Sequence, residues 1–182
     1  MDKNYETAIF GGGCFWCTEV IFSKLKGVIS VTPGYAGGKT RNPSYMKVCS
    51  GTTGHAEVIK IEYDPFIIKY TDLLDVFFHV HDPTTINKQG NDTGEQYRSI
   101  ILYESQQHRE QAEEYIRGLN TSKEFANPVV TQVRPLADFY PAESYHRDYY
   151  ETNTAQPYCQ AVISPKLAKF RNKFKNLLTA QD

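Results

Sequence analysis

A cysteine that follows three glycines at the start of a predicted helix is the residue best suited to nucleophilic chemistry. Residues 11–17 have the sequence GGGCFWC, and the apolar run at residues 7–10 predicts a strand that ends in a turn just before it. Free N–H groups and positive partial charge at a helix N-terminus lower a thiol pKa, so we expect a reactive thiol at Cys14. Phe15 and Trp16 would form an apolar wall beside it, which suits a substrate with a small apolar part.

The spacing of Cys14 and Cys17 allows other interpretations. The pair could be half of a zinc site completed by Cys49, Cys159 or a histidine, but zinc sites usually show a second closely spaced pair, and this sequence has none. The pair could also be a thioredoxin-like dithiol that exchanges disulfides by itself. Trp16 could simply be a core residue. We therefore predict no metal site.

Glu57 is a carboxylic acid on the apolar face of a predicted strand at residues 56–63. Side chains alternate between the faces of a strand, so Glu57 shares its face with Ile59 and Ile61, whereas Lys60 lies on the other. Burial would raise the pKa of the carboxyl and make it a candidate proton donor near neutral pH. The alternative is a glutamate at the strand edge that reaches solvent, and the alternation alone does not decide between the two.

The predicted elements that position these residues follow the order strand, helix, strand, strand, helix, strand, helix, strand. Strands are predicted at residues 7–10, 28–35, 56–63, 98–103 and 129–133, and helices start near residues 14, 71 and 105. We expect Pro33-Gly34 to interrupt the second strand and Thr71 to cap the second helix. This order predicts an α+β fold, a two-layer α/β sandwich with a mixed sheet.

The pattern changes after residue 150. Residues 151–164 predict a loop that contains Cys159, and Pro165 then opens a terminal helix. One face of this helix is basic, with Lys166, Lys169, Arg171, Lys173 and Lys175. We expect that face to be solvated rather than to bind an anionic partner. The chain is predicted to be one domain, residues 1–182, with residues 1–150 as its core and residues 151–182 as a C-terminal tail that wraps it.

Composition narrows the class of protein. The chain has 182 residues, of which 40% are hydrophobic and 23% are charged, as in ordinary globular proteins. Its net charge of −1 lacks the excess of positive charge that is typical of nucleic-acid-binding proteins. No apolar run approaches the roughly 18 residues of a membrane span, and the first residues are polar rather than signal-like. We expect a cytoplasmic monomer, in a compartment where thiols stay reduced.

A series of short blocks resembles the A-type peptide-methionine sulfoxide reductases. They are GGCFW (12–16), GYAGG (34–38), NPSY (42–45), TGHAE (53–57), HDPT (81–84), QGNDTG (89–94), QYRS (96–99) and FYPAESYH (139–146). They occur in the family's order and cover roughly residues 8–159. The resemblance implies a ferredoxin-like sandwich and the reduction of methionine S-sulfoxide, free or in proteins, as a repair of oxidised proteins.

The resemblance also implies roles for individual residues. Cys14 would be the catalytic cysteine, Phe15 and Trp16 would hold the methyl group of the sulfoxide, and Glu57 would protonate its oxygen. The hydroxyls expected to donate to that oxygen belong to Tyr45 and Tyr97. Asp92 would order the polar end of the pocket.

The implied chemistry leaves Cys14 as a sulfenic acid, which a second thiol converts to a disulfide. The resemblance slightly favours Cys159 as the resolving cysteine, because Pro157-Tyr158-Cys159 is similar to the family's C-terminal Tyr-Cys and lies in a predicted mobile loop. Cys17 is its rival, because a Cys-x-x-Cys at a helix start can close a disulfide by itself. Thioredoxin or a similar thiol reductant would recycle the disulfide, with no bound cofactor. Cys49 is expected to be a small buried hydrophobe, and His55 and His146 to be structural.

Two hypotheses from other classes compete with this one. A general dithiol carrier would reduce protein disulfides and would not need Glu57. A non-enzymatic module would bind oxidised or methyl-bearing peptides through Phe15 and Trp16 and would keep its affinity without Cys14.

Overall fold

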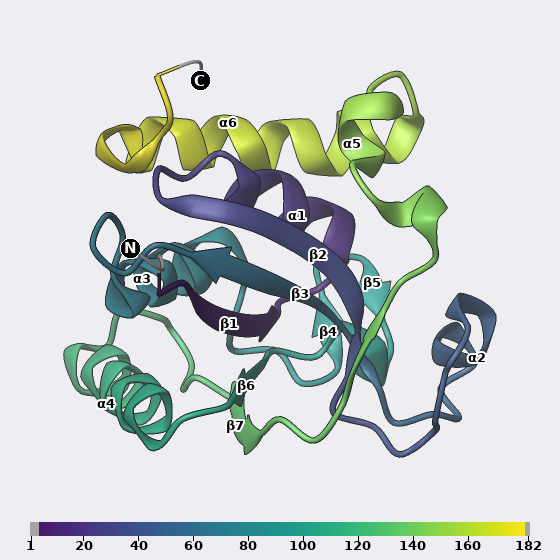
Figure 1. The fold of residues 1–182 in the computed structure, drawn as a ribbon, viewed down its shortest axis with the longest axis horizontal. Coiled ribbons are helices and arrows are strands. Elements are labelled where there is room, and N and C mark those ends of the chain that lie inside the picture. Colours follow the sequence, from purple (N-terminus) through teal and green to yellow (C-terminus); the bar gives the residue numbers. More distant parts are fainter. Residues whose placement is uncertain (1–3, 181–182) are drawn as a thin grey trace.

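A curled mixed sheet lies at the centre of the computed structural model, which describes residues 4–180 (Figure 1). Within these residues the larger sheet has six strands, in the spatial order β7 (Gln132–Pro135), β6 (Ile100–Tyr103), β1 (Glu6–Gly11), β3 (Ala56–Tyr63), β2 (Val28–Ala36) and β8 (Phe139–Pro141). Only β6 and β7 pair in parallel, and the other neighbours are antiparallel. The predicted α+β class and mixed sheet are confirmed.

The helices lie mainly on one face of this sheet. They are α1 (Phe15–Ser23), α2 (Tyr45–Cys49), α3 (Tyr70–Val80), α4 (Gln106–Ser122), α5 (Tyr149–Thr152) and α6 (Ser164–Lys173). Helix α1 packs on β2 and β3, and α6 packs outside it against α1 and α3 (Figure 1). None of the helices in residues 4–180 combines the length and the apolar character needed to cross a membrane.

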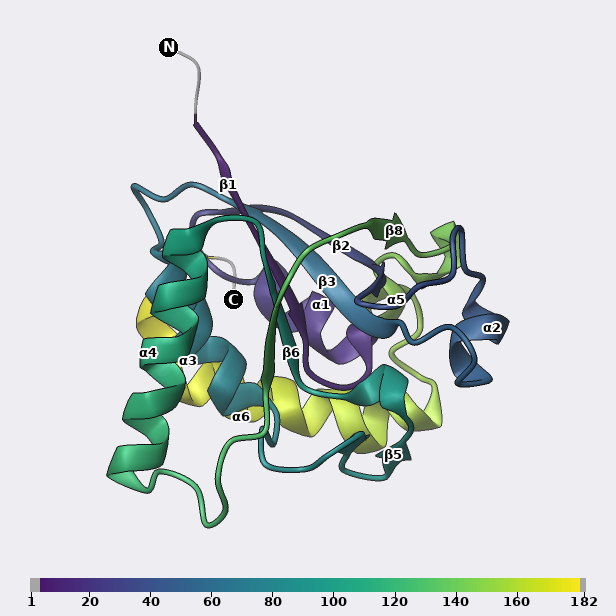
Figure 2. The same ribbon diagram turned by 90° about the horizontal axis from the view of Figure 1, so that it is seen from below.

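Apolar side chains fill both sides of the sheet. The main core joins the helix-facing side of the sheet, with Phe10, Ile59 and Ile61, to α1, α3 and α6. A smaller cluster on the opposite face is covered by the chain that links β7 to β8, where Leu136 and Phe139 pack (Figure 2). The sheet therefore has little exposed surface in its middle, and its strand ends are free to carry a site.

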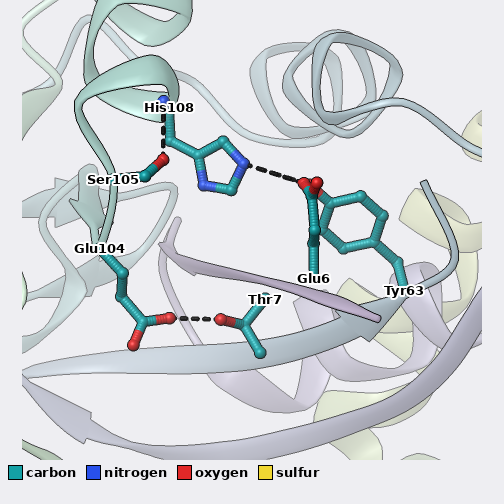
Figure 3. A network of polar contacts seen from close by, with 6 residues as sticks. All are labelled: Glu6, Thr7, Tyr63, Glu104, Ser105 and His108. Carbon is teal, nitrogen blue, oxygen red and sulfur yellow. Dashed lines mark hydrogen bonds and ion pairs between the residues drawn. The ribbon is translucent and has the colours of Figure 1, made fainter. Parts of the chain in front are cut away.

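A polar network secures the N-terminal end of β1 (Figure 3). The Tyr63 hydroxyl donates to Glu6 Oε2 at 2.7 Å, and His108 Nε2 lies 3.3 Å from the same oxygen. Thr7 donates to Glu104, and Ser105 caps α4 by accepting from the His108 N–H at 3.1 Å. β1 is thus tied to β3 and α4 at the end of the strand remote from Cys14.

Strand β2 runs through Pro33-Gly34, so the predicted interruption is wrong. Pro33 pairs with Ile59 of β3, and its carbonyl accepts from the Ala142 N–H at 2.9 Å on the β8 side. The N–H that proline lacks would point to that side, beyond the last β2–β8 pair at Gly34 and Pro141. The β3 ladder therefore loses no hydrogen bond.

Other boundaries also differ from the prediction. Thr71 does not cap α3, because Lys69 precedes the helix and its N–H donates to Asp72 Oδ2 at 2.9 Å. Strands β6 and β7 begin later than predicted, and α2 and β8 were not predicted at all. The long connection at residues 81–96 carries a small hairpin, β4 (Lys88–Gln89) with β5 (Asp92–Thr93), and the 3-10 turn η1 (Glu95–Tyr97) begins within it.

The tail differs most from the prediction. Cys159 does not lie in a loop, because Cys159–Ile163 form a π-helical turn, η3, that runs directly into α6. Leu167 and Phe170 of α6 are buried in the main core. The tail is thus a helical layer packed on α1 (Figure 1).

Candidate active site

Cys14 lies where β1 ends and α1 begins, as predicted. It is the residue that caps α1, and its carbonyl accepts from the Cys17 N–H at 3.1 Å. Gly13 precedes it with φ +95°, and a Cβ there would come within 2.6 Å of the Gln89 side chain. Only glycine lets the loop place Cys14 this close to the hairpin of β4 and β5.

The two thiols at the start of α1 are hydrogen-bonded to each other. Hydrogen bonding with Cys17, followed by burial and the charge of Glu57, raises the pKa of Cys14 well above its ordinary value. The same hydrogen bond, helped by Lys166, lowers the pKa of Cys17. The predicted low pKa of Cys14 is therefore wrong for the free protein, because the neighbouring thiol outweighs the helix N-terminus.

Glu57 is buried beside the cysteine loop. The side chain is 2% exposed, and its Oε2 accepts from the Phe15 N–H at 3.0 Å. Burial raises the pKa of Glu57 to about 8. The prediction of a buried carboxyl with a raised pKa is confirmed, and the solvent-reaching alternative is wrong. At neutral pH the group holds a proton that it can donate.

Two tyrosines lie within electrostatic reach of this carboxyl. Tyr45 opens α2 and Tyr97 ends η1, and both are half-buried. Burial, and next the charge of Glu57, raises the pKa of Tyr45 and of Tyr97, so both hydroxyls remain proton donors. Glu143 holds the start of α2, because its Oε2 accepts from the Tyr45 N–H at 3.0 Å.

The indole of Trp16 is held by side chains from the C-terminal third of the chain. Its Nε1 donates to His146 Nδ1 at 3.0 Å, and Tyr149 stacks on it with ring centroids 3.7 Å apart. Tyr158 meets the indole edge-on. Phe15, in contrast, is fully buried against Tyr35 and His146. The aromatic wall therefore depends on residues outside the GGGCFWC segment.

His146 was expected to be structural, and it positions a site residue by holding the indole of Trp16. Burial lowers its pKa, so the ring is neutral at neutral pH. Since Nδ1 accepts from Trp16, the proton is on Nε2, which is buried without a hydrogen-bond partner among the described residues. His55 is structural as predicted, because Nδ1 accepts from the Gly38 N–H at 3.0 Å. The FYPAESYH block was the signal for His146, but position in a motif does not reveal a ring contact.

A cavity of about 300 Å³ opens beside the two thiols. Its lining includes Cys14, Cys17, Asp92, Tyr158 and Lys166. Asp92 accepts from the Tyr158 hydroxyl at 2.7 Å, so the tail closes one side of the cavity. Among residues 4–180, no three His, Cys, Asp or Glu side chains are grouped so as to hold a metal ion.

The remaining cysteines do not lie where they were expected. Cys159 is fully buried in η3, where burial and then the charge of Cys17 raise its pKa. Cys49 is exposed at the end of α2, so its prediction as a buried hydrophobe is wrong. All four cysteines are free thiols. Cys17 is the one that directly accompanies Cys14.

Comparison with known proteins agrees with this geometry. A family model described as "Peptide methionine sulfoxide reductase" matches residues 6–178. A protein from Polynucleobacter asymbioticus named "Peptide methionine sulfoxide reductase MsrA" is 51% identical over 183 residues, which is 99% of this chain and 96% of that protein. A protein of the same name from Chromobacterium violaceum is 55% identical, over 95% of this chain and 98% of its own.

The fold has a solved counterpart as well. The crystal structure of Mxr1 from Saccharomyces cerevisiae in reduced form superposes with a TM-score of 0.80 at 34% identity, and covers 87% of this chain and 91% of that chain. The described architecture, with its curled sheet and flanking helices, is therefore one that a known protein shares.

Proposed function

The chain belongs to the peptide methionine sulfoxide reductase family, and from that premise we propose how its residues carry out the reaction. The protein is an enzyme that reduces methionine sulfoxide to methionine at the expense of thiols. One observation carries the assignment of roles: a buried, protonated Glu57 lies next to the loop that presents Cys14.

Glu57 acts as the general acid. A sulfoxide is a weak electrophile until its oxygen accepts a proton, and a carboxyl with a pKa of about 8 holds one at neutral pH. Ionised Glu57 opposes the formation of the Cys14 thiolate, because the two negative charges repel each other. Neutral Glu57 does not. Tyr45 and Tyr97 stabilise the sulfoxide oxygen as fixed donors, and Asp92 orders the polar end of the cavity.

Cys14 then attacks the substrate sulfur. The oxygen passes to Cys14 as a sulfenic acid, the substrate sulfur gains two electrons, and methionine leaves. Phe15 and Trp16 form the apolar wall that receives the methyl group. A methyl wall and oxygen donors on fixed sides fit one configuration of the sulfoxide, so we assign selectivity for the S epimer.

Cys17 resolves the sulfenic acid. Residues three apart at a helix start have Cα atoms about 5 Å apart by α-helical geometry, within the roughly 4.4–6.8 Å that disulfides span. Hydrogen bonding between the two thiols supports this pairing. Cys159 would have to leave a buried helical turn to reach Cys14. The Cys17 thiol displaces water to form the disulfide, and a thioredoxin-like dithiol then reduces it.

The whole chain is proposed to act as one catalytic domain in the cytoplasm. The tail supplies Tyr158 to the cavity wall and Phe170 to the main core, which supports a single unit. A mechanism that needs free thiols at Cys14 and Cys17 fits a reducing compartment.

The test is dithiothreitol-driven reduction of the two methionine sulfoxide epimers, measured separately with the wild type and with Cys14→Ser. We expect turnover of the S epimer only, abolished by the substitution. A folded protein that reduces neither epimer but reduces insulin disulfides would instead be a dithiol carrier, and one that binds sulfoxide peptides without turnover would be a binding module.

A further inference from the structure

A second and larger hollow lies next to the cavity lined by Cys14 and Cys17, which we call the reactive cavity. Its volume is about 800 Å³, and it lies between the C-terminal end of α3, residues 125–127 and the helix α6. We call it the lysine groove. Its lining includes three lysines on α6, Lys166, Lys169 and Lys173, and three phenylalanines, Phe125, Phe170 and Phe174. The basic face of α6, which was expected only to be solvated, therefore forms one wall of this hollow. Its phenylalanines provide apolar surface.

The lysine groove carries an unbalanced positive charge. Within residues 4–180, no carboxylate lies at ion-pair distance from Lys166, Lys169 or Lys173. Asp82 is the only acidic residue in the lining, and its Oδ1 accepts from the Thr84 N–H at 2.9 Å and from the Thr84 hydroxyl. The groove therefore suits a ligand that brings negative charge together with apolar surface.

The groove adjoins the cavity that Cys14 and Cys17 line. Gln89 and Lys166 line both hollows, and Cys14 lines the smaller one. A polypeptide whose oxidised methionine reaches Cys14 must continue beyond the cavity on both sides. One of these directions leads past Gln89 and Lys166 into the lysine groove.

The spacing of the lysines matches an extended chain. Lys166 and Lys173 are separated by seven residues, about 10 Å along an α-helix. An extended peptide rises about 3.3 Å per residue, so about three successive residues would pass along this wall. Acidic side chains within that stretch would meet the ammonium groups in turn.

We propose that the lysine groove binds an acidic stretch adjacent to the methionine sulfoxide of a polypeptide substrate, so that the enzyme prefers oxidised methionines with Asp or Glu nearby. This inference rests on the proposed function, since it assigns a substrate preference to the same site. The groove does not take part in the chemistry, and free methionine sulfoxide does not reach it.

The test compares three substrates with dithiothreitol as the reductant. They are free methionine S-sulfoxide, a peptide with Asp and Glu at the second to fifth positions on both sides of the sulfoxide, and the same peptide with Asn and Gln there. The variant is Lys169→Gln with Lys173→Gln, which leaves Lys166 and the cavity intact. The matched control is Lys26→Gln with Lys175→Gln, which removes the same charge from a different hollow, beside the C-terminal end of α6.

We expect the wild type to prefer the acidic peptide in kcat/KM by about threefold or more, as two exposed ion pairs would give. The preference should fall in high salt. The variant should lose it while its rate on free methionine sulfoxide is unchanged, and the control should keep it.

Three results would overturn the inference. An equal preference in wild type and variant would mean that the lysines do not bind the substrate. An unchanged preference, together with a raised KM for thioredoxin when thioredoxin replaces dithiothreitol, would assign the groove to the protein reductant instead. Failure of the wild type to turn over free methionine sulfoxide would refute the proposed function, and the inference with it.

Discussion

At the scale of single residues, the chemistry of the site depends on whether Glu57 and Cys14 are protonated. Glu57 keeps its proton because it is buried, and Cys14 keeps its proton because Cys17 and burial hold it there. Strand alternation raised the first effect as one of two possibilities, and the structure decides for it. The sequence could not predict the second, because the spacing of two cysteines does not tell how their thiols are oriented.

Replacing Glu57 by Gln should remove the proton donor and leave the fold intact. Turnover of methionine S-sulfoxide should fall on the order of hundreds-fold, the size of a general-acid contribution. The measurement is kcat at neutral pH, with circular dichroism as the check on folding. A rate equal to that of the wild type would remove Glu57 from the mechanism.

The pH dependence gives an independent view of the same group. The pKa of Glu57 is about 8, and the pKa of Cys14 is raised well above its ordinary value. Single-turnover methionine formation should therefore rise with pH up to about 8, as more Cys14 becomes thiolate, and then level off as Glu57 loses its proton. In Glu57→Gln the rate should keep rising above pH 8, and a levelling near pH 8 in that variant would assign the titration to another group.

His146→Phe should loosen Trp16 without removing any group that touches the reacting atoms. Loss of one hydrogen bond is worth about 0.5–1.5 kcal/mol, so kcat/KM should fall about two- to tenfold, mainly through KM. Trp16 is the only tryptophan in the chain, so its fluorescence should change in the free protein too. Unchanged fluorescence and kinetics would show that His146 does not position the indole.

At the scale of elements, periodicity located the strands and helices better than their ends. The alternation at residues 56–63 identified β3 with its correct boundaries. The prediction that Pro33 would interrupt β2 failed because a proline is harmless where its missing N–H faces the end of a neighbouring strand. The prediction of a loop at residues 151–164 failed at η3. This helical turn is stabilised by the burial of Cys159 and Ile163, and such tertiary packing leaves no local pattern in the sequence.

The helical state of η3 leads to a prediction about the two candidate resolving cysteines. Cys17→Ser should still form methionine in a single turnover but should lose most of its steady-state rate with thioredoxin. Cys159→Ser should keep both rates, since its thiol is fully buried in η3. The opposite pattern, with Cys159→Ser impaired and Cys17→Ser normal, would mean that η3 unwinds during catalysis.

At the scale of the whole molecule, the site is assembled from segments far apart in the chain. Cys14 lies in the turn after β1, and Glu57 lies on the neighbouring strand β3. Tyr158 and Lys166 come from the tail that packs over α1 (Figure 1). Short motifs can mark such residues one by one. Their convergence near Cys14 is a property of the fold.

Phe170→Ala should therefore destabilise the whole protein. The side chain is 2% exposed in the main core, and its removal should lower the free energy of unfolding by about 3–5 kcal/mol. Urea denaturation should show one cooperative transition at a lower midpoint. A transition unchanged in midpoint, or a separate early step, would indicate that residues 151–182 are not part of the single folding unit.

The central claim is that Cys14 removes the oxygen of methionine sulfoxide and that Cys17 then closes a disulfide with it. The most direct measurement is a single turnover of the reduced protein with methionine S-sulfoxide and no reductant, in which methionine is counted and the cysteines are mapped by mass spectrometry. We predict about one methionine per protein and a disulfide between Cys14 and Cys17. Absence of methionine, or equal methionine from Cys14→Ser, would contradict the account.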